Sequence, residues 1–176
     1  IVQARPETVQ SQKAGNILKN YRLQGSGDVL IAGRAVGEMI GQGKARVILD
    51  VHQIDQFQEG EVLVTNKTDP DWEPIMKKAS AIVTNQGGRT CHAAIIAREM
   101  GIPAIVGCGN ATGTLHTGQE VTVCCAEGEE GKVYAGLVPF EIQETALDNL
   151  PPTKTKILMN VGNPEEAFGL SSIPCD

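Results

Sequence analysis

The change from a strand to a helix falls within Thr84-Asn85-Gln86-Gly87-Gly88-Arg89-Thr90-Cys91-His92-Ala93-Ala94. The β-branched end of a strand precedes two glycines, which let the chain turn without a Cβ in the way. Residues 92–100 then predict a helix, with Thr90 as its N-cap and Gly101 at its C-terminal stop. The stretch therefore predicts a strand, a tight turn and a helix whose first turn contains His92.

Short apolar runs rich in β-branched residues lie on both sides of this stretch, separated by Gly, Asp and Asn. Such runs are typical of short strands, and one further short helix is expected at 71–78. The predicted strands are 46–49, 61–65, 81–84, 103–106, 120–123 and 132–134. The sequence predicts an α/β fold that is rich in sheet and has few, short helices.

Composition excludes several classes of protein. The 176 residues, 41% of them apolar, are enough for one domain with a buried core, and disorder throughout is not expected. No run approaches the roughly 20 apolar residues of a membrane helix, so no membrane span is expected. A net charge of −6 and an aromatic content of 3% disfavour binding to nucleic acid.

Cysteine usage indicates a reducing, cytoplasmic setting. The five cysteines are an odd number, no two are spaced as C-x-x-C, and none pairs with a histidine at zinc-ligand spacing. We therefore expect neither a disulfide scaffold nor a metal site. Neighbouring residues at a helix start point in different directions, so Cys91 and His92 make a poor thiol dyad. Cys91 is expected to be a small packing residue that lines the site.

Both ends of the sequence look like parts of neighbouring units. Residues 1–4 are typical of the end of a strand, and 156–161 of a strand that starts another unit. Residues 9–20 are expected to be a short helix or a connector. Residues 141–155, with two adjacent prolines, are predicted to be an exposed linker. We expect the chain to be the middle of a longer protein.

His92 is expected where a helix presents unpaired N–H groups and the positive end of its dipole. Such a point suits an anion, and Arg89 adds a cation nearby. Gly87 and Gly88 leave little bulk around the ring, and the positive helix end favours a neutral ring with one nitrogen free to attack. The pattern favours a nucleophilic histidine that carries a phosphoryl group; a plain capping or surface histidine is the other interpretation.

The run 87–99, followed by 101–107, resembles the phosphohistidine signature of the phosphoenolpyruvate-utilising enzymes. Upstream lies Thr68-Asp69-Pro70-Asp71-Trp72-Glu73-Pro74. That run, with Cys rather than Ser before the histidine, resembles the branch of the family that uses water as the second phosphoryl acceptor. A pyruvate phosphate dikinase-like carrier and a non-catalytic module that binds an anion at the same helix end are the alternatives.

The resemblance implies an order of domains. Residues 1–20 would be the end of an ATP-binding domain with a linker, and 21–140 the swivelling β/β/α phosphohistidine domain. A linker at 141–155 would lead to a barrel that binds pyruvate or phosphoenolpyruvate, starting with 156–176. A domain that delivers one group to two distant sites must move between them, so the linkers are expected to act as hinges.

The resemblance also implies the chemistry. His92 would take a phosphoryl group derived from ATP and pass it to pyruvate, giving phosphoenolpyruvate with AMP and phosphate as the other products. Gly87, Gly88 and Arg89 would bind phosphate and shape the site. Thr90 matches a threonine modified by a bifunctional regulatory kinase/phosphorylase, and a phosphate there would add about −1.5 to −2 charges beside the carrier. Mg²⁺ is the implied cofactor, with ligands outside this chain, and the whole enzyme is expected to be a cytoplasmic homo-oligomer.

Overall fold

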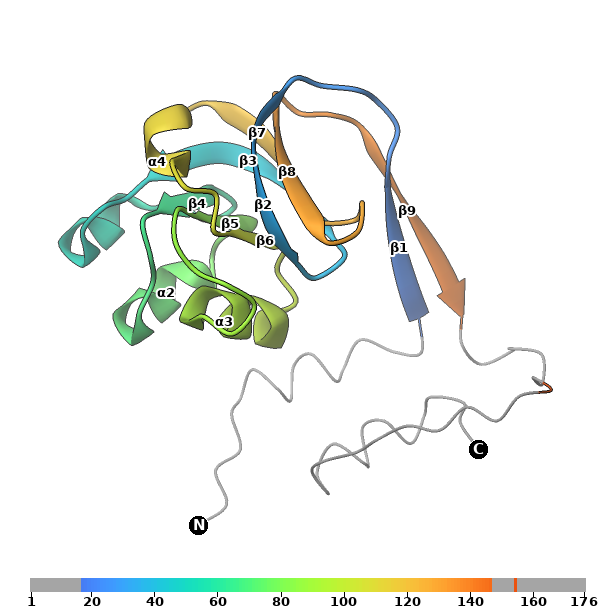
Figure 1. Cartoon of the computed structure of the whole chain (residues 1–176), viewed down its shortest axis with the longest axis horizontal. Helices are drawn as coiled ribbons and strands as arrows, with labels where there is room; N and C mark the ends of the chain where they lie inside the picture. Colours follow the sequence, from blue (N-terminus) through green and yellow to red (C-terminus); the bar gives the residue numbers. More distant parts are fainter. Residues whose placement is uncertain (1–16, 147–153, 155–176) are drawn as a thin grey trace, which may run out of the picture. The chain divides into compact units, whose positions relative to one another are not determined.

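The computed structural model describes residues 17–146 and residue 154 (Figure 1). The chain falls into two units. The larger unit is Asn20–Ile142, and the second combines Ile1–Lys19 with Gln143–Asp176. The larger unit contains every strand that the sequence predicted between residues 46 and 134, together with the candidate site.

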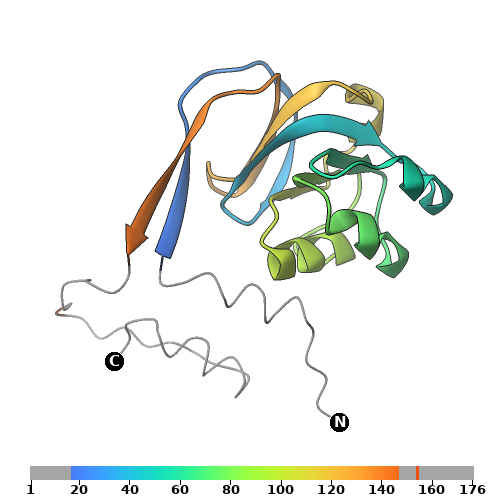
Figure 2. The same cartoon turned by 180° about the vertical axis from the view of Figure 1, so that it is seen from behind.

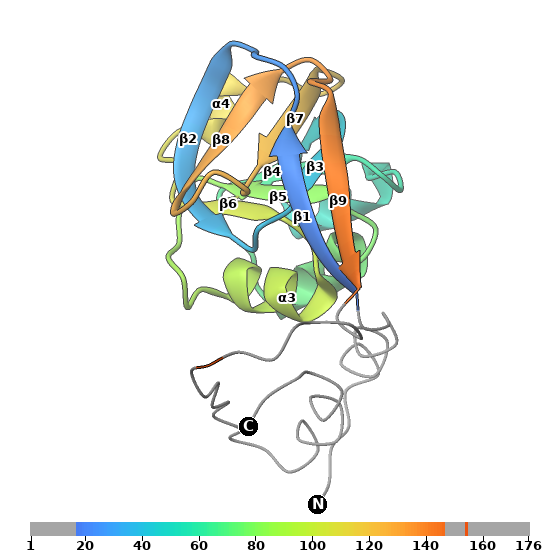
Figure 3. The ribbon, with the colours of Figure 1, turned by 90° about the vertical axis from the view of Figure 1, so that its right-hand side faces the viewer.

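A closed barrel of strands forms the larger unit, and Figure 3 shows how the strands wrap around it. The strands are hydrogen-bonded in the order β2-β6-β5-β4-β3-β7-β8. Because the sheet closes on itself, each barrel strand has a partner on both sides. The barrel and its few short helices confirm the predicted fold class. The strand bounds are β2 Val29–Val36, β3 Ile40–Val47, β4 Val62–Thr65, β5 Ala81–Thr84, β6 Ala104–Val106, β7 Glu120–Cys124 and β8 Glu130–Ala135.

Strands β3, β4, β5 and β6 run parallel to one another, whereas the remaining barrel pairs are antiparallel. A parallel step needs a connection that returns along the sheet, and short helices lie in these returns. They are η1 Val51–Gln56, η2 Pro70–Trp72 with α2 Glu73–Met76, and α3 His92–Met100. The helix predicted at 71–78 is thus two shorter pieces. The loops that follow β4, β5 and β6 consequently meet at one edge of the sheet.

Two apolar cores cover the two faces of β4, β5 and β6. Val62 and Val64 point into the barrel, where α4 (Ala111–Thr114) contributes its first residue, while Leu63 points outward. The outward core is covered by α2 and α3, which Figures 1 and 2 both show on the same side of these strands. Every residue of β4 and β5 is buried. Burial on both faces explains why these strands are continuous apolar runs without polar alternation.

The two ends of α3 compare differently with the prediction. Gly101 ends the helix in the left-handed conformation, with a φ of 66°, as predicted. At the other end the N-cap is Cys91, whose side chain makes no capping hydrogen bond, so the prediction of Thr90 as the cap is wrong. The Cys91 N–H donates to the carbonyl of Gly88 at 3.1 Å, and this extra turn leaves the Thr90 side chain exposed, one residue before the cap.

A two-stranded sheet is formed by β1 (Ile17–Leu23) and β9 (Phe140–Ala146). The last residues of the predicted connector at 9–20 are therefore strand, and the predicted linker at 141–155 begins as strand. Apart from residue 154, the rest of that linker lies outside the described residues, as does the expected barrel segment 156–176. The domain order at both ends stays a prediction.

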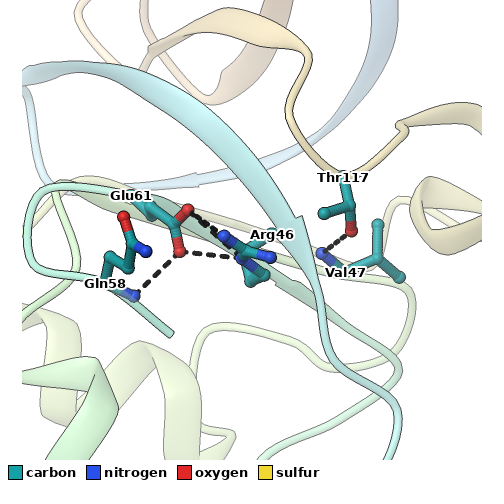
Figure 4. A network of polar contacts seen from close by, with 5 residues as sticks. All are labelled: Arg46, Val47, Gln58, Glu61 and Thr117. Carbon is teal, nitrogen blue, oxygen red and sulfur yellow. Dashed lines mark hydrogen bonds and ion pairs between the residues drawn. The ribbon is translucent and has the colours of Figure 1, made fainter. Parts of the chain in front are cut away.

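Arg46 and Glu61 join the end of β3 to the start of β4 (Figure 4). The Arg46 guanidinium donates to both Glu61 carboxylate oxygens at 2.6–3.2 Å, and the Gln58 N–H donates to Oε2 at 2.9 Å. Burial by itself raises the pKa of Glu61, but the hydrogen bonds from Arg46 and Gln58 and the Arg46 charge hold that pKa below its ordinary value. Beside this pair, the Val47 N–H donates to Thr117 Oγ1 at 3.0 Å, which ties β3 to the segment before β7.

Candidate functional site

Residues 85–91 join β5 to α3 and are named here the Gly-Gly loop. Its first half is fixed by the loops that follow the neighbouring parallel strands. The Asn85 N–H donates to the carbonyl of Thr65, the last residue of β4, at 3.0 Å, and the Gln86 N–H donates to the carbonyl of Asn66 at 2.9 Å. The Gly109 N–H donates to the Asn85 carbonyl at 2.9 Å. The Asn85 side chain also exchanges two hydrogen bonds with Thr112 of α4, at 2.7 and 3.0 Å. The start of the loop is therefore held rigidly.

Gly87 is the glycine that this turn requires. Its φ is 128°, and a Cβ there would lie 2.7 Å from the Cys91 sulfur. Gly107, after β6, has a φ of 72°, and a Cβ there would lie 2.8 Å from the Gly87 carbonyl oxygen. A Cβ at Gly88 would meet no atom of the described residues within 4 Å, so this glycine leaves space instead of relieving a clash. No role in the site was predicted for Gly107, although a glycine directly after a strand is a recognisable signal of close approach.

His92 is the first residue of α3, and its side chain is 22% exposed. Ring nitrogen Nδ1 lies 3.1 Å from Thr68 Oγ1. Ring nitrogen Nε2 lies 3.7 Å from Glu73 Oε1, which is too far for a hydrogen bond. Among the described residues Nε2 has no hydrogen-bond partner, and this atom is shielded from solvent. One nitrogen is thus oriented by a hydroxyl, and the other is unpaired and covered.

Thr68 and Glu73 reach the ring from the connection between β4 and β5. Asp69 caps η2 by accepting the Asp71 N–H at 3.1 Å, and Pro70 follows at the first helical position. This cap fixes the segment that carries Thr68, and Glu73 opens α2 one turn later. Neither residue was predicted to have a role, although both lie in the run 68–74 that carries part of the family resemblance. Their positions after a parallel strand next to β5 were the available signal.

The structure places Arg89 against Glu129. Its guanidinium lies 2.8 Å from Glu129 Oε1, on the connection between β7 and β8, and its side chain is 54% exposed. The hydrogen bond from Arg89, followed by the charges of Arg89 and Arg34, lowers the pKa of the Glu129 carboxyl. Within the described part of the chain no hydrogen bond joins Arg89 to His92. The cation expected beside the ring is therefore paired elsewhere in this conformation.

Thr90 and Cys91 complete the loop. Thr90 is exposed, two residues before His92, so an enzyme that modifies hydroxyls can reach it. Cys91 is half-buried and packs against the core under α3, as expected for a packing residue. The remaining expectations for the loop concern phosphate binding by Gly87, Gly88 and Arg89, and these stay predictions.

No three His, Cys, Asp or Glu side chains gather as metal ligands would in residues 17–146 or at residue 154. The Mg²⁺ that the resemblance implies therefore has no ligand set in the described part of the chain, and its location in other domains stays a prediction. The described helices include none that is long and apolar enough to cross a membrane.

Comparison with known proteins relates part of the chain to a family. Residues 57–128 match the model described as "PEP-utilising enzyme, mobile domain". Over these residues the chain is similar to the mobile domain of the phosphoenolpyruvate-utilising enzymes. The matched residues run from just before β4 to the turn after β7, so they contain Thr68, Glu73 and His92.

Named relatives match the whole of this chain. It is 70% identical over 176 residues to a phosphoenolpyruvate synthase of Synechocystis sp., covering 100% of this chain and 22% of that protein. It is 55% identical over 174 residues to the phosphoenolpyruvate synthase of Escherichia coli, covering 99% of this chain and 22% of that protein. A solution structure titled Enzyme I is 34% identical over 45% of this chain and 33% of its own, with a TM-score of 0.39. The chain thus spans about a fifth of the length of the curated relatives.

Proposed function

We propose that this chain contains the phosphoryl-carrier domain of a phosphoenolpyruvate synthase. His92 takes a phosphoryl group derived from ATP and passes it to pyruvate, with AMP and phosphate as the other products. The supporting observation is the ring itself: it stands at the start of α3, with Nδ1 oriented by Thr68, and its Nε2 has no hydrogen-bond partner in the part of the chain that the structure describes. The family match and the 70% identity to a phosphoenolpyruvate synthase support the substrate class.

Thr68 prepares the ring for attack. A neutral imidazole carries its proton on one nitrogen only, and the other nitrogen keeps a lone pair. When Nδ1–H donates to Thr68 Oγ1, the lone pair lies on Nε2, which becomes the nucleophile. In the first transfer Nε2 attacks the β-phosphorus of ATP, and the bond from that phosphorus to the AMP oxygen breaks. Water then takes the terminal phosphoryl group as phosphate, which leaves one phosphoryl group on Nε2. In the second transfer the N–P bond breaks, an enolate oxygen of pyruvate bonds to phosphorus, and the lone pair returns to Nε2.

The Glu73 carboxylate affects how an anion can be held beside His92. Its carboxylate lies 3.7 Å from Nε2, so a free anion near Nε2 would be repelled. A covalent N–P bond holds the phosphoryl group against this repulsion, and the same repulsion favours its transfer to an acceptor. The geometry therefore argues for a covalent carrier and against a module that only binds anions. Because Nε2 is shielded, the ring or the segment that carries Thr68 and Glu73 must shift before a donor can reach it.

The remaining parts of the proposal concern the whole enzyme. ATP and pyruvate bind in flanking domains, Mg²⁺ neutralises charge at those sites, and the enzyme is a cytoplasmic homo-oligomer. A bifunctional kinase/phosphorylase acts on Thr90, which is exposed in the Gly-Gly loop. A phosphate on Thr90 would carry about −1.5 to −2 charges two residues before the carrier and would repel a second phosphoryl group.

Labelling of the full-length protein tests the carrier assignment. Incubation with ATP labelled in the β-phosphate is expected to give a His92 phosphate that is labile in acid and stable in base. Replacement His92→Ala is expected to abolish the label, while His52→Ala, an exposed histidine on η1, leaves it intact. Undiminished labelling of His92→Ala would contradict the proposal. Detection of pyrophosphate in place of phosphate among the products would favour the pyruvate phosphate dikinase-like alternative.

A further inference from the structure

Glu129 binds two arginines from different parts of the larger unit. Its Oε1 lies 2.8 Å from Arg89 of the Gly-Gly loop, and its Oε2 lies 3.1 Å from Arg34 of β2. We call these three residues the Glu129 bridge. The bridge joins the loop before His92 to the barrel wall. All three side chains are at least half exposed: Arg34 is 50% exposed, Arg89 54% and Glu129 74%.

The second half of the Gly-Gly loop is bordered by open space. A cavity of about 650 Å³ is lined by Arg89, Arg98, Glu129 and Gly37, and a second of about 630 Å³ by Arg34, Glu129 and the glycines of the loop. Arg98 of α3 donates to the Arg89 carbonyl, and within the loop the Cys91 N–H donates to the Gly88 carbonyl. Asn85 bonds to the last residue of β4, whereas this half makes no backbone hydrogen bond to a barrel strand among the described residues. The Glu129 bridge is its side-chain link to the barrel.

Arg89 pairs with Glu129 in this structure, and a phosphoryl group on His92 would offer it a second partner. Glu129 offers a single negative charge, which it shares with Arg34. A phosphoryl group on His92, three residues along the chain, would offer about two charges and three acceptor oxygens, and guanidinium groups bind such oxygens strongly. When Arg89 moves away from Glu129, the Glu129 carboxylate still pairs with Arg34, so the exchange leaves no carboxylate unpaired.

We propose that Glu129 is a positioning residue that holds Arg89 on the barrel wall while His92 is unphosphorylated and yields it to the phosphoryl group. This inference rests on the proposed carrier function of His92. It predicts that Glu129 competes with the phosphoryl group for one guanidinium. Removal of the carboxylate charge should then free Arg89 in the resting protein and favour the phosphorylated state.

Limited trypsin digestion of the full-length protein measures how often Arg89 is free of Glu129, because trypsin must bind the Arg89 side chain to cleave the Arg89–Thr90 bond. In the unphosphorylated protein, mass spectrometry is expected to show this cut about three to five times faster in Glu129→Gln than in wild type. The matched control is Glu127→Gln, on the same β7–β8 connection. Glu127 pairs with Lys132 at 3.2 Å and with Tyr134 at 2.8 Å, and it has no contact with the loop among those described, so the rate should not change.

Phosphorylation of His92 then tests whether Glu129 positions Arg89 or only stabilises the loop. His92 is phosphorylated with ATP or with phosphoramidate, from which the ring nitrogen takes the phosphoryl group and releases ammonia. Cleavage at Arg89 in Glu129→Gln should return to about the wild-type rate, because the phosphoryl oxygens bind the freed guanidinium. At equilibrium with phosphoenolpyruvate and pyruvate, the phosphorylated fraction of Glu129→Gln should exceed that of wild type about threefold.

Two results would overturn the inference. One is equal cleavage at Arg89 in unphosphorylated wild type and Glu129→Gln. The other is cleavage of Glu129→Gln that phosphorylation does not slow. Absence of any phosphate on His92 would instead defeat the proposed function, whereas the comparison of the unphosphorylated proteins would still test the Glu129 bridge by itself.

Discussion

Two arginine–glutamate pairs in this protein have the same chemistry and different surroundings. Arg46 and Glu61 are 23% and 9% exposed, and the carboxylate also accepts the Gln58 N–H. Arg89 and Glu129 are 54% and 74% exposed, and the carboxylate is shared with Arg34. The first pair joins two adjacent barrel strands, whereas the second joins a loop to the wall of the barrel.

Burial decides what each pair can do. A buried carboxylate with three N–H donors is costly to leave unpaired, so the Arg46–Glu61 pair cannot open without loss of stability. Water replaces an exposed partner at little cost, so the Arg89–Glu129 pair can exchange. The same two residue types therefore form a permanent contact where they are buried and a reversible contact where they are exposed.

The largest expected effect is on stability. Replacement Glu61→Gln should lower the free energy of unfolding of the chain by about 2–3 kcal/mol, because it leaves the Arg46 charge without its partner in a partly buried place. Replacement Glu129→Gln should leave it nearly unchanged, because water replaces an exposed partner at little cost. Urea denaturation followed by circular dichroism measures both. Similar losses of unfolding free energy in the two variants would show that burial does not distinguish the two pairs.

Acid should remove the contribution of Glu61. Its pKa is lowered in the folded chain, so the stability it provides is complete above the unfolded pKa of about 4.3 and is lost as the pH falls through the folded pKa. The difference in urea midpoint between wild type and Glu61→Gln should therefore be constant from about pH 7 to pH 5 and shrink below about pH 4. A difference that stays constant down to pH 3 would show that the carboxylate charge is not what matters.

A negative charge at Thr90 should disturb the exposed pair. Replacement Thr90→Glu places a carboxylate beside Arg89 and near the transferred phosphoryl group, so phosphorylation of His92 should slow by about tenfold with unchanged folding. Thr90→Gln is the matched control, because it has the same size without the charge, and it should retain most of the rate. Labelling with β-phosphate ATP measures both, and near-normal labelling of Thr90→Glu would count against a regulatory role.

The smallest expected effect is that of salt. Raising ionic strength from about 0.05 M to 0.5 M shortens the screening length to a few ångströms and weakens exposed pairs most. Trypsin cleavage after Arg89 should then rise about twofold in wild type and stay constant in Glu129→Gln, where the pair is already absent. A salt effect of equal size in both proteins would mean that salt acts on trypsin or on the whole loop.

The sequence predicted the central strands well and missed others for a physical reason. The runs at 61–65, 81–84 and 103–106 match β4, β5 and β6 closely because burial on both faces makes them continuously apolar. Strand β2 and the first part of β3 were missed, since their glycines read as turn residues. A Cβ at Gly33 would lie 2.8 Å from the Cys108 sulfur, and at Gly41 2.3 Å from the Ser80 carbonyl oxygen. These glycines serve close approach between chain segments, which a local pattern does not reveal.

In the candidate site, too, some features could be predicted from the local sequence and others could not. The turn and the helix that present His92 follow from local residues, and Gly101 ends that helix as predicted. The Thr90 cap was wrong because capping depends on one extra turn of backbone, which the spacing of residues does not fix. Arg89 was expected beside the ring, yet the structure pairs it with Glu129, 40 positions away in the sequence.

By itself the sequence determined that a histidine begins a helix after a glycine turn, because propensity and capping act over a few residues. Only the tertiary structure decided which groups surround that histidine. Thr68 and Glu73 reach the ring because β4 and β5 pair in parallel register, which brings the loops after both strands to one edge of the sheet. Glu129 reaches the loop because barrel closure pairs β8 with β2 and brings the β7–β8 connection to it. Contacts of this kind depend on strand register and barrel closure, which are properties of the whole fold.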